Sequence, residues 1–157
     1  MTALGILGRG LEGAHSPYGI VSFEFAGDLA AVERMLEGWG EPGRTLAGFH
    51  LGLDFLFLVL YPSCIALACG LAVARLHPRH KRWAQLGAWV AWGQVLAGLL
   101  DALENTALLG LLLGRVSAPL PCMTWWCAAG KFALVGAGLV FLVPASVLSM
   151  TAGARKP

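Results

Sequence analysis

Charged residues are scarce in this chain of 157 amino acids. Asp, Glu, Lys and Arg together make up 13% of the sequence, whereas hydrophobic residues make up 57% and the mean hydropathy is +0.70. An average soluble domain carries roughly 25% charged residues. A water-soluble fold of this size could not bury so much apolar surface and still coat itself with charge. The composition therefore predicts an integral membrane protein, with the lipid bilayer as its first partner.

Several motifs typical of a particular chemistry are also missing. The sequence holds no G-x-S-x-G or H-E-x-x-H pattern and no paired Cys-x-x-Cys zinc pattern. It has no long basic run interleaved with aromatic residues, so we expect no nucleic-acid partner. These absences leave an enzymatic activity unsupported, and we lean toward a protein that is not an enzyme; the cofactor stays unknown.

Three long apolar segments fill most of the chain. They cover about residues 46–74, 83–114 and 124–150. A transmembrane helix needs roughly 20 mostly apolar residues to cross the hydrocarbon core, and each segment exceeds that length. We therefore predict an all-α, polytopic transmembrane helix bundle with three spans in residues 46–150. Residues 1–45 would form an extramembrane N-terminal segment, and residues 151–157 a cytoplasmic tail.

The N-terminal segment contains one amphipathic pattern. Asp28 is placed to cap a helix, and Gly38 and Gly40 are placed to end it. Between them, apolar residues recur at helical spacing opposite charged ones: Leu29, Val32, Leu36 and Trp39. We predict an interfacial helix that lies on the membrane or on the bundle, preceded by an extended stretch at residues 17–25.

Basic residues indicate the orientation. Four of them fall between the first two apolar segments and two follow the third: Arg75, Arg79, Lys81, Arg82, Arg155 and Lys156. Because cytoplasmic loops are enriched in Lys and Arg, we expect this loop and the C-terminus in the cytoplasm and the N-terminus outside. The outer turn then lies near residues 119–121. Cys122 and Cys127 flank that turn, where they either pair in a disulfide or remain thiols.

The most informative residues are the polar ones inside the apolar segments. A central Asp or Lys costs roughly 2.5–3.5 kcal/mol to insert, so such groups persist only with partners or in a wet cavity. The polar residues of the first segment share one helical face, as do those of the second, and the helical rise places the charges of all three segments in one half of the bilayer. We predict one buried cluster: His50, Asp54, Tyr61, Asp101, Glu104, Asn105 and Lys131. Its three acids outnumber its one lysine, so the cluster needs a proton or a second cation.

Three interpretations of this cluster stay open. It is a structural network that fixes helix register, a proton or cation site built on Asp54, Asp101 and Glu104, or a metal or cofactor site to which His50 adds a nitrogen ligand. Our working hypothesis is the first, in a non-enzymatic accessory or structural subunit of a membrane assembly. Because three helices can barely surround a pathway, we expect a homo-oligomer or a larger membrane protein complex.

Three stretches carry a family resemblance: GIVSFEFAG at residues 19–27, LDFLFLVLYP at 53–62 and LLDALENTALL at 99–109. They resemble a group of small, uncharacterised bacterial inner-membrane proteins with an LDFLF-x3-Y helix, a D-x2-EN helix and a lysine-bearing helix. The resemblance covers roughly residues 19–142 and implies a bacterial inner (plasma) membrane location without implying an activity. The matching residues here are Asp54, Tyr61, Asp101, Glu104, Asn105 and Lys131. Members of the group begin with a further transmembrane helix that has no counterpart here, so a partner would supply it or the bundle would be incomplete alone.

Overall fold

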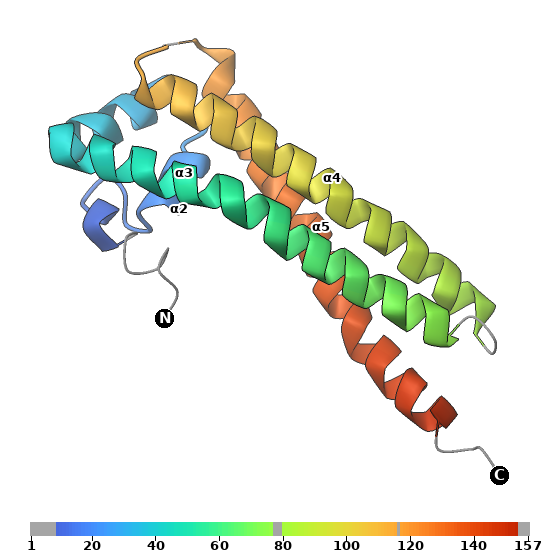
Figure 1. Ribbon diagram of the computed structural model, residues 1–157. Coiled ribbons are helices and arrows are strands. Elements are labelled where there is room, and N and C mark those ends of the chain that lie inside the picture. The colour runs from blue at the N-terminus through green and yellow to red at the C-terminus, as the bar shows by residue number, and fades with distance from the viewer. Residues whose placement is uncertain (1–8, 77–79, 116, 154–157) are drawn as a thin grey trace. The chain divides into compact units, whose positions relative to one another are not determined.

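The computed structural model describes residues 9–76, 80–115 and 117–153, with side chains up to residue 148. Of these residues 87% are helical, and no strand occurs among them. The elements in chain order are η1 (Arg9–Leu11), α2 (Ile20–Glu24), α3 (Leu29–Leu76), α4 (Lys81–Leu112) and α5 (Pro119–Gly153) (Figure 1). The all-α fold class predicted from the sequence is therefore confirmed.

Three of these helices are long and apolar enough to cross a membrane. Helix α3 has 48 residues, α4 has 32 and the described apolar part of α5 has 30. By length and composition they agree with the three predicted spans, although α5 begins at Pro119 rather than at residue 124. Residues 77–79 of the basic loop and residues 154–157 of the expected tail, and with them Arg79, Arg155 and Lys156, lie outside the described residues.

Helix α3 consists of two helices joined at Gly40. This residue has φ +57° and ψ −167°, a conformation that glycine adopts without the steric penalty of a side chain. The stretch before Gly40 is the predicted amphipathic helix, and its N-cap is confirmed, because the Ala31 N–H donates to Asp28 Oδ1 at 2.8 Å. Val32 and Leu36 on its apolar face are buried in a core that the protein itself supplies.

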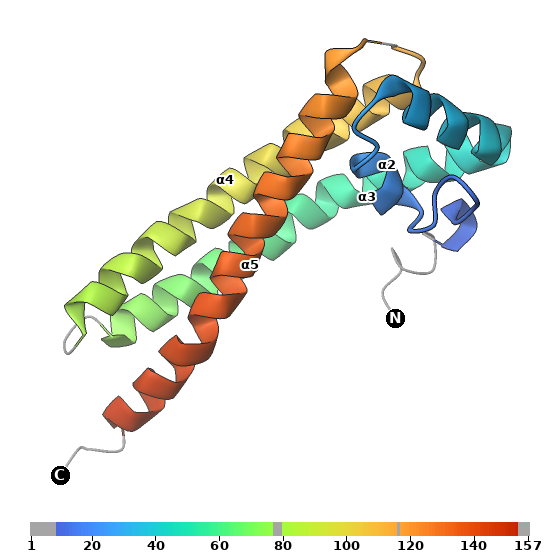
Figure 2. The same ribbon diagram turned by 180° about the vertical axis from the view of Figure 1, so that it is seen from behind.

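The stretch before α3 corrects one prediction. Residues 17–25 are not extended, because they contain α2. Ile20, Phe23 and Glu24 share one helical face and all three are buried, so tertiary packing overrides the strand propensity of this sequence. Helix α2 lies beside the N-terminal part of α3 (Figure 2), where the rings of Phe23 and Trp39 meet edge to face with centroids 5.3 Å apart.

The chain forms two compact units, each with its own core. The first unit comprises residues 1–58 and 100–129, and the second comprises residues 59–99 and 130–157. The core of the first unit draws on η1, α2, the beginning of α3 and the end of α4, with Leu11, Phe23, Val32, Leu51, Leu108 and Leu111 among its members. The core of the second unit is smaller and centres on Cys69, Leu76, Phe141 and Ala145.

Two glycines allow the helices of the second unit to approach closely. A Cβ atom at Gly138 on α5 would lie 2.7 Å from Gln94 Nε2 on α4 and 2.8 Å from Ile65 Cγ2 on α3. A Cβ atom at Gly87 on α4 would lie 2.5 Å from the Phe141 ring on α5. Small residues at helix crossings are typical of membrane proteins, where packing replaces the hydrophobic effect as the force between helices.

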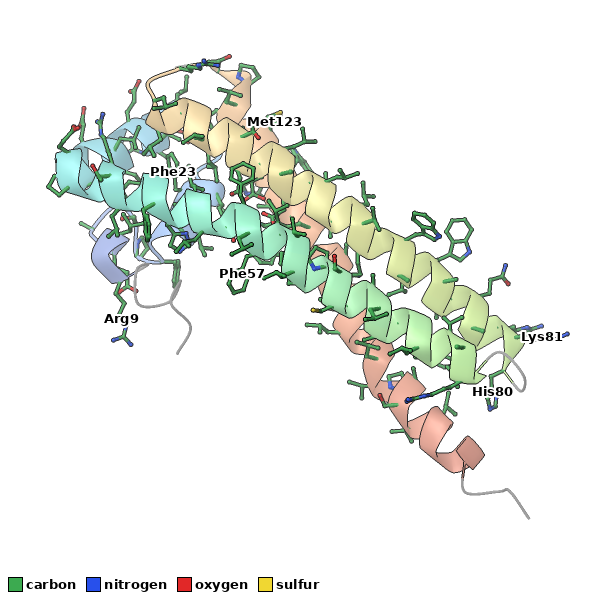
Figure 3. The ribbon with its side chains drawn as sticks, viewed as in Figure 1. Arg9, Phe23, Phe57, His80, Lys81 and Met123 are labelled. Carbon is green, nitrogen blue, oxygen red and sulfur yellow. The ribbon has the colours of Figure 1, made fainter. Side chains whose placement is uncertain are left out.

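Large apolar side chains cover the outside of the long helices. Phe57 on α3 (Figure 3), Trp92 on α4 and Val140 on α5 are all exposed. At the beginning of α4, the charged side chain of Lys81 points away from the helices (Figure 3). Exposed apolar patches of this extent mark contact with a membrane or with other proteins.

Candidate functional site

One hydrogen bond joins two of the candidate spans within the first unit. Asn105 Nδ2 on α4 donates to Asp54 Oδ2 on α3 at 2.8 Å. Asn105 is completely buried and Asp54 is half-buried. Farther along the same pair, a Cβ atom at Gly48 would lie 3.5 Å from Leu112, so α3 and α4 run antiparallel with Asp54 opposite Asn105. The hydrogen bond therefore ties the register of the two helices at a defined point.

The other polar residues predicted on these helices in the first unit are buried as well. Asp101 and Glu104 are 1% and 0% exposed, and they lie one helical turn before Asn105 and next to it. His50, one turn before Asp54 on α3, is 7% exposed. All five predicted cluster residues of the first unit are thus buried or half-buried.

Glu24 is a further buried acid of the first unit, and it was missing from the predicted cluster. It lies on α2 between Phe23 and Phe25 and is 6% exposed. In the sequence Glu24 belongs to the predicted extramembrane segment of residues 1–45 and to its predicted extended stretch, residues 17–25. The signal that would have revealed its burial is its helical spacing from Ile20, a residue of the same buried face.

These residues concentrate carboxyl groups inside the first unit. The unit holds three buried carboxyl side chains and one that is half-buried: Glu24, Asp101, Glu104 and Asp54. None of its four Lys or Arg side chains is buried: Arg9, Arg34, Arg44 and Arg115. A carboxylate removed from water needs hydrogen bonds, a counter-charge or a proton. The Asn105 amide supplies one such hydrogen bond to Asp54.

The remaining two predicted cluster residues, Lys131 and Tyr61, belong to the second unit. Lys131 on α5 is 5% exposed, and its Nζ lies 5.2 Å from the centroid of the Phe132 ring. Tyr61 on α3 is half-buried. The meeting of the Lys131 ammonium with the carboxyl groups of the first unit stays a prediction.

Gln94 is a polar residue of the second unit that the predicted cluster left out. It is completely buried on α4, on the side that it shares with Asp101 by helical spacing. Its Nε2 donates to Leu134 O on α5 at 2.8 Å and to Val90 O at 3.3 Å. Its Oε1 has no hydrogen-bond partner among the described residues. Gln94 therefore links α4 to α5, as Asn105 links α4 to α3.

Cys122 and Cys127 both remain thiols in the structure, which is one of the two alternatives that the sequence left open. Both residues lie within α5, and Cys122 is exposed whereas Cys127 is buried. Five residues of helix rise about 7.5 Å, and a disulfide requires Cα atoms no more than roughly 7 Å apart. Because α5 already begins at Pro119, the two cysteines do not face each other across a turn.

Neither a metal-binding group among the described residues nor a similar known protein identifies the site. Across residues 9–76, 80–115 and 117–153, no group of three or more His, Cys, Asp and Glu side chains is arranged to hold a metal ion. No family model, curated protein or solved structure matches the chain.

Proposed function

We propose that this protein is a non-enzymatic accessory or structural subunit of a membrane assembly. The observation that carries the proposal is the hydrogen bond from Asn105 to Asp54, which links two candidate spans at 2.8 Å. Polar contacts between membrane helices are worth about 0.6 kcal/mol on average, so they select one helix pairing more than they stabilise it. By selecting one helix pairing, such contacts keep the outward-facing side chains of the paired helices in a defined arrangement that a partner protein can bind.

The exposed apolar faces support a place in a larger assembly. Trp89 and Trp92 on α4 are 72% and 71% exposed, and tryptophan is enriched where proteins bind one another. Three transmembrane helices can barely surround a pathway for an ion or a solute. A homo-oligomer or a larger membrane protein complex, with some of these faces covered by neighbouring helices and the rest by lipid, is therefore the proposed state.

The proposed location is the bacterial inner (plasma) membrane, with the N-terminus outside and the C-terminus in the cytoplasm. Arg75, at the end of α3, and Arg82, at the beginning of α4, are exposed, and such basic residues mark the cytoplasmic side. With the other cysteines replaced by Ala, exposed Cys122 near the start of α5 should react with a membrane-impermeant maleimide in intact cells. An Arg82→Cys variant should react only after lysis. The opposite labelling pattern would reverse the proposed orientation.

A proton- or cation-handling site is the second candidate function. The burial of three carboxyl side chains in the first unit supports it: Glu24, Asp101 and Glu104. Carboxyl groups inside membrane helices are the usual components of proton relays and ion pathways. Asn105 Oδ1, which has no hydrogen-bond partner among the described residues, adds an acceptor of the kind that a cation or a protonated group would use.

Purification and reconstitution separate the two candidates. An accessory subunit should co-purify in mild detergent with fixed partners or with a fixed number of copies, seen by native mass measurement. It should also mediate no proton flux when it is the only protein in liposomes. Flux that is abolished by Glu104→Gln and retained by Thr106→Val, a change at an exposed neighbouring position, would establish the second candidate instead. Stoichiometric bound metal would also refute the accessory function.

A further inference from the structure

The first unit contains a cavity that is lined by none of the predicted cluster residues. Its volume is about 410 Å³, within the range of roughly 300–1,000 Å³ that is typical of small-molecule sites. The N-terminal segment forms one wall with Glu12 and His15, and the beginning of α3 forms the other with Met35, Trp39 and Leu46. The cavity thus combines a polar edge with an apolar and aromatic floor.

The aromatic wall of this cavity is fixed before any ligand arrives. Trp39 Nε1 donates to Leu11 O at 2.8 Å and to Ser16 Oγ at 2.9 Å. The Phe23 ring packs edge to face against the same indole, with centroids 5.3 Å apart. Because both hydrogen bonds occupy the indole N–H, Trp39 contributes ring atoms to the cavity lining and no free hydrogen-bond donor. A π surface attracts cations, and tryptophan does so most strongly among the aromatic side chains.

The charge of the lining favours the same kind of ligand. Glu12 contributes a carboxyl group, and none of the described residues that line the cavity is Lys or Arg. The lining thus combines one acid with the imidazole of His15 and no Lys or Arg, so it offers an anionic ligand no permanent positive charge. A cation with apolar substituents would meet the carboxyl group, the indole face and the apolar side chains of Met35 and Leu46 together.

We propose that this cavity binds an organic ammonium ion, with the cationic head between the Trp39 ring and the Glu12 carboxyl group. The headgroup of an ammonium-bearing phospholipid and a free amine share this chemistry. The proposal is independent of the accessory function, because none of the residues that line the cavity takes part in the hydrogen bond between Asn105 and Asp54.

Calorimetric titration of the full-length protein tests the proposal. The protein is placed in nanodiscs of phosphatidylglycerol alone, which carries no ammonium group, and choline is added. Its neutral isostere 3,3-dimethylbutan-1-ol serves as the comparison. Choline should bind at least about tenfold more tightly than the isostere, since the isostere loses both the cation–π contact and the ion pair. Equal binding of the two compounds, or no binding of choline, would refute the ammonium site.

Charge-reversal variants locate the site. Glu12 is exposed, so Glu12→Lys should leave the fold intact while it abolishes choline binding. Glu33→Lys is the matched control, because Glu33 is exposed on α3 and does not line the cavity, and it should bind choline as the native protein does. Retained binding in the Glu12→Lys variant, with the fold checked by circular dichroism, would place choline elsewhere and contradict the assignment.

The source of the ammonium group is distinguished by the lipid. If a headgroup occupies the cavity, phosphatidylethanolamine added to the nanodiscs should weaken choline binding, and native mass measurement should find a retained lipid that the Glu12→Lys variant lacks. If a free amine is the ligand, choline should bind equally well with and without phosphatidylethanolamine. Both results support the ammonium site, and they differ only in where the cation comes from.

Discussion

Replacing Asn105 with Leu should destabilise the protein more than replacing Asn105 and Asp54 together. The single change removes the amide that donates to Asp54 Oδ2 at 2.8 Å and leaves a half-buried carboxyl group without that donor. Asp54→Leu instead strands the completely buried Asn105 amide, whose Oδ1 has no hydrogen-bond partner among the described residues. The double change removes both polar groups and leaves apolar side chains of similar volume at the contact between α3 and α4.

The size of the effect follows from the cost of unpaired polar groups. A buried donor or acceptor that loses its partner costs about 1–3 kcal/mol, whereas replacing both partners by apolar groups is nearly neutral. Each single variant should therefore lose about 1–3 kcal/mol in the free energy of unfolding, and the double variant less than about 1 kcal/mol. The two single losses minus the loss in the double variant give a coupling energy of about 1 kcal/mol or more.

A double-mutant cycle in a bilayer measures this coupling. Unfolding is followed by steric trapping in nanodiscs for the native protein, the two single variants and the double variant. Thr106→Val, combined with Asp54→Leu, is the control, because Thr106 is exposed and its hydroxyl donates to Ala102 O within α4 at 2.7 Å. The control cycle should be additive. Additivity within about 0.5 kcal/mol for Asn105 and Asp54 themselves would show that their contact does not tie the two helices.

Three further variants probe the packing. Gly138→Ala should lower the free energy of unfolding by about 1–3 kcal/mol, because its Cβ atom would lie 2.7 Å from Gln94 Nε2. Gly136→Ala should be neutral or slightly stabilising, because nothing lies within 4 Å of the added atom. Thermal unfolding in detergent measures both, and equal losses would contradict close packing at Gly138. Gln94→Leu should change the free energy of unfolding by less than about 1 kcal/mol. The change loses a hydrogen bond to α5, but it also removes an Oε1 atom that has no hydrogen-bond partner among the described residues. A larger loss would point to a partner for that oxygen. Asp28→Ala should cost about 0.5–2 kcal/mol and speed amide exchange in the first turn of α3, whereas the exposed Glu33→Ala should not.

Local features of the fold were predictable because each depends on a few neighbouring residues. Asp28 caps α3 since its carboxyl group reaches the Ala31 N–H three residues on, and Gly40 interrupts the helix since glycine alone adopts φ +57° readily. The three long helices follow from apolar runs that exceed a membrane's thickness. The short helix α2 did not follow, because five residues carry too weak a periodic signal, and its helical face became favourable only by burial.

Among the polar residues, too, some burial was predictable from the sequence and some was not. Helical periodicity alone placed Asp101, Glu104 and Asn105 on one side of α4, and all three are buried. The burial of Glu24 was not predicted, because residues 17–25 were expected to be extended and no helical face was assigned to them.

Composition and spacing by themselves determined that this protein is helical, has three segments able to cross a membrane, and carries charge where charge is costly. Tertiary structure alone decided that Asp54 faces the Asn105 amide, that Gly138 is where α5 approaches its neighbours, and that two cysteines of one helix stay apart. The physical reason is that periodicity records which side of a helix a residue is on. Only packing determines what lies opposite that side and how near.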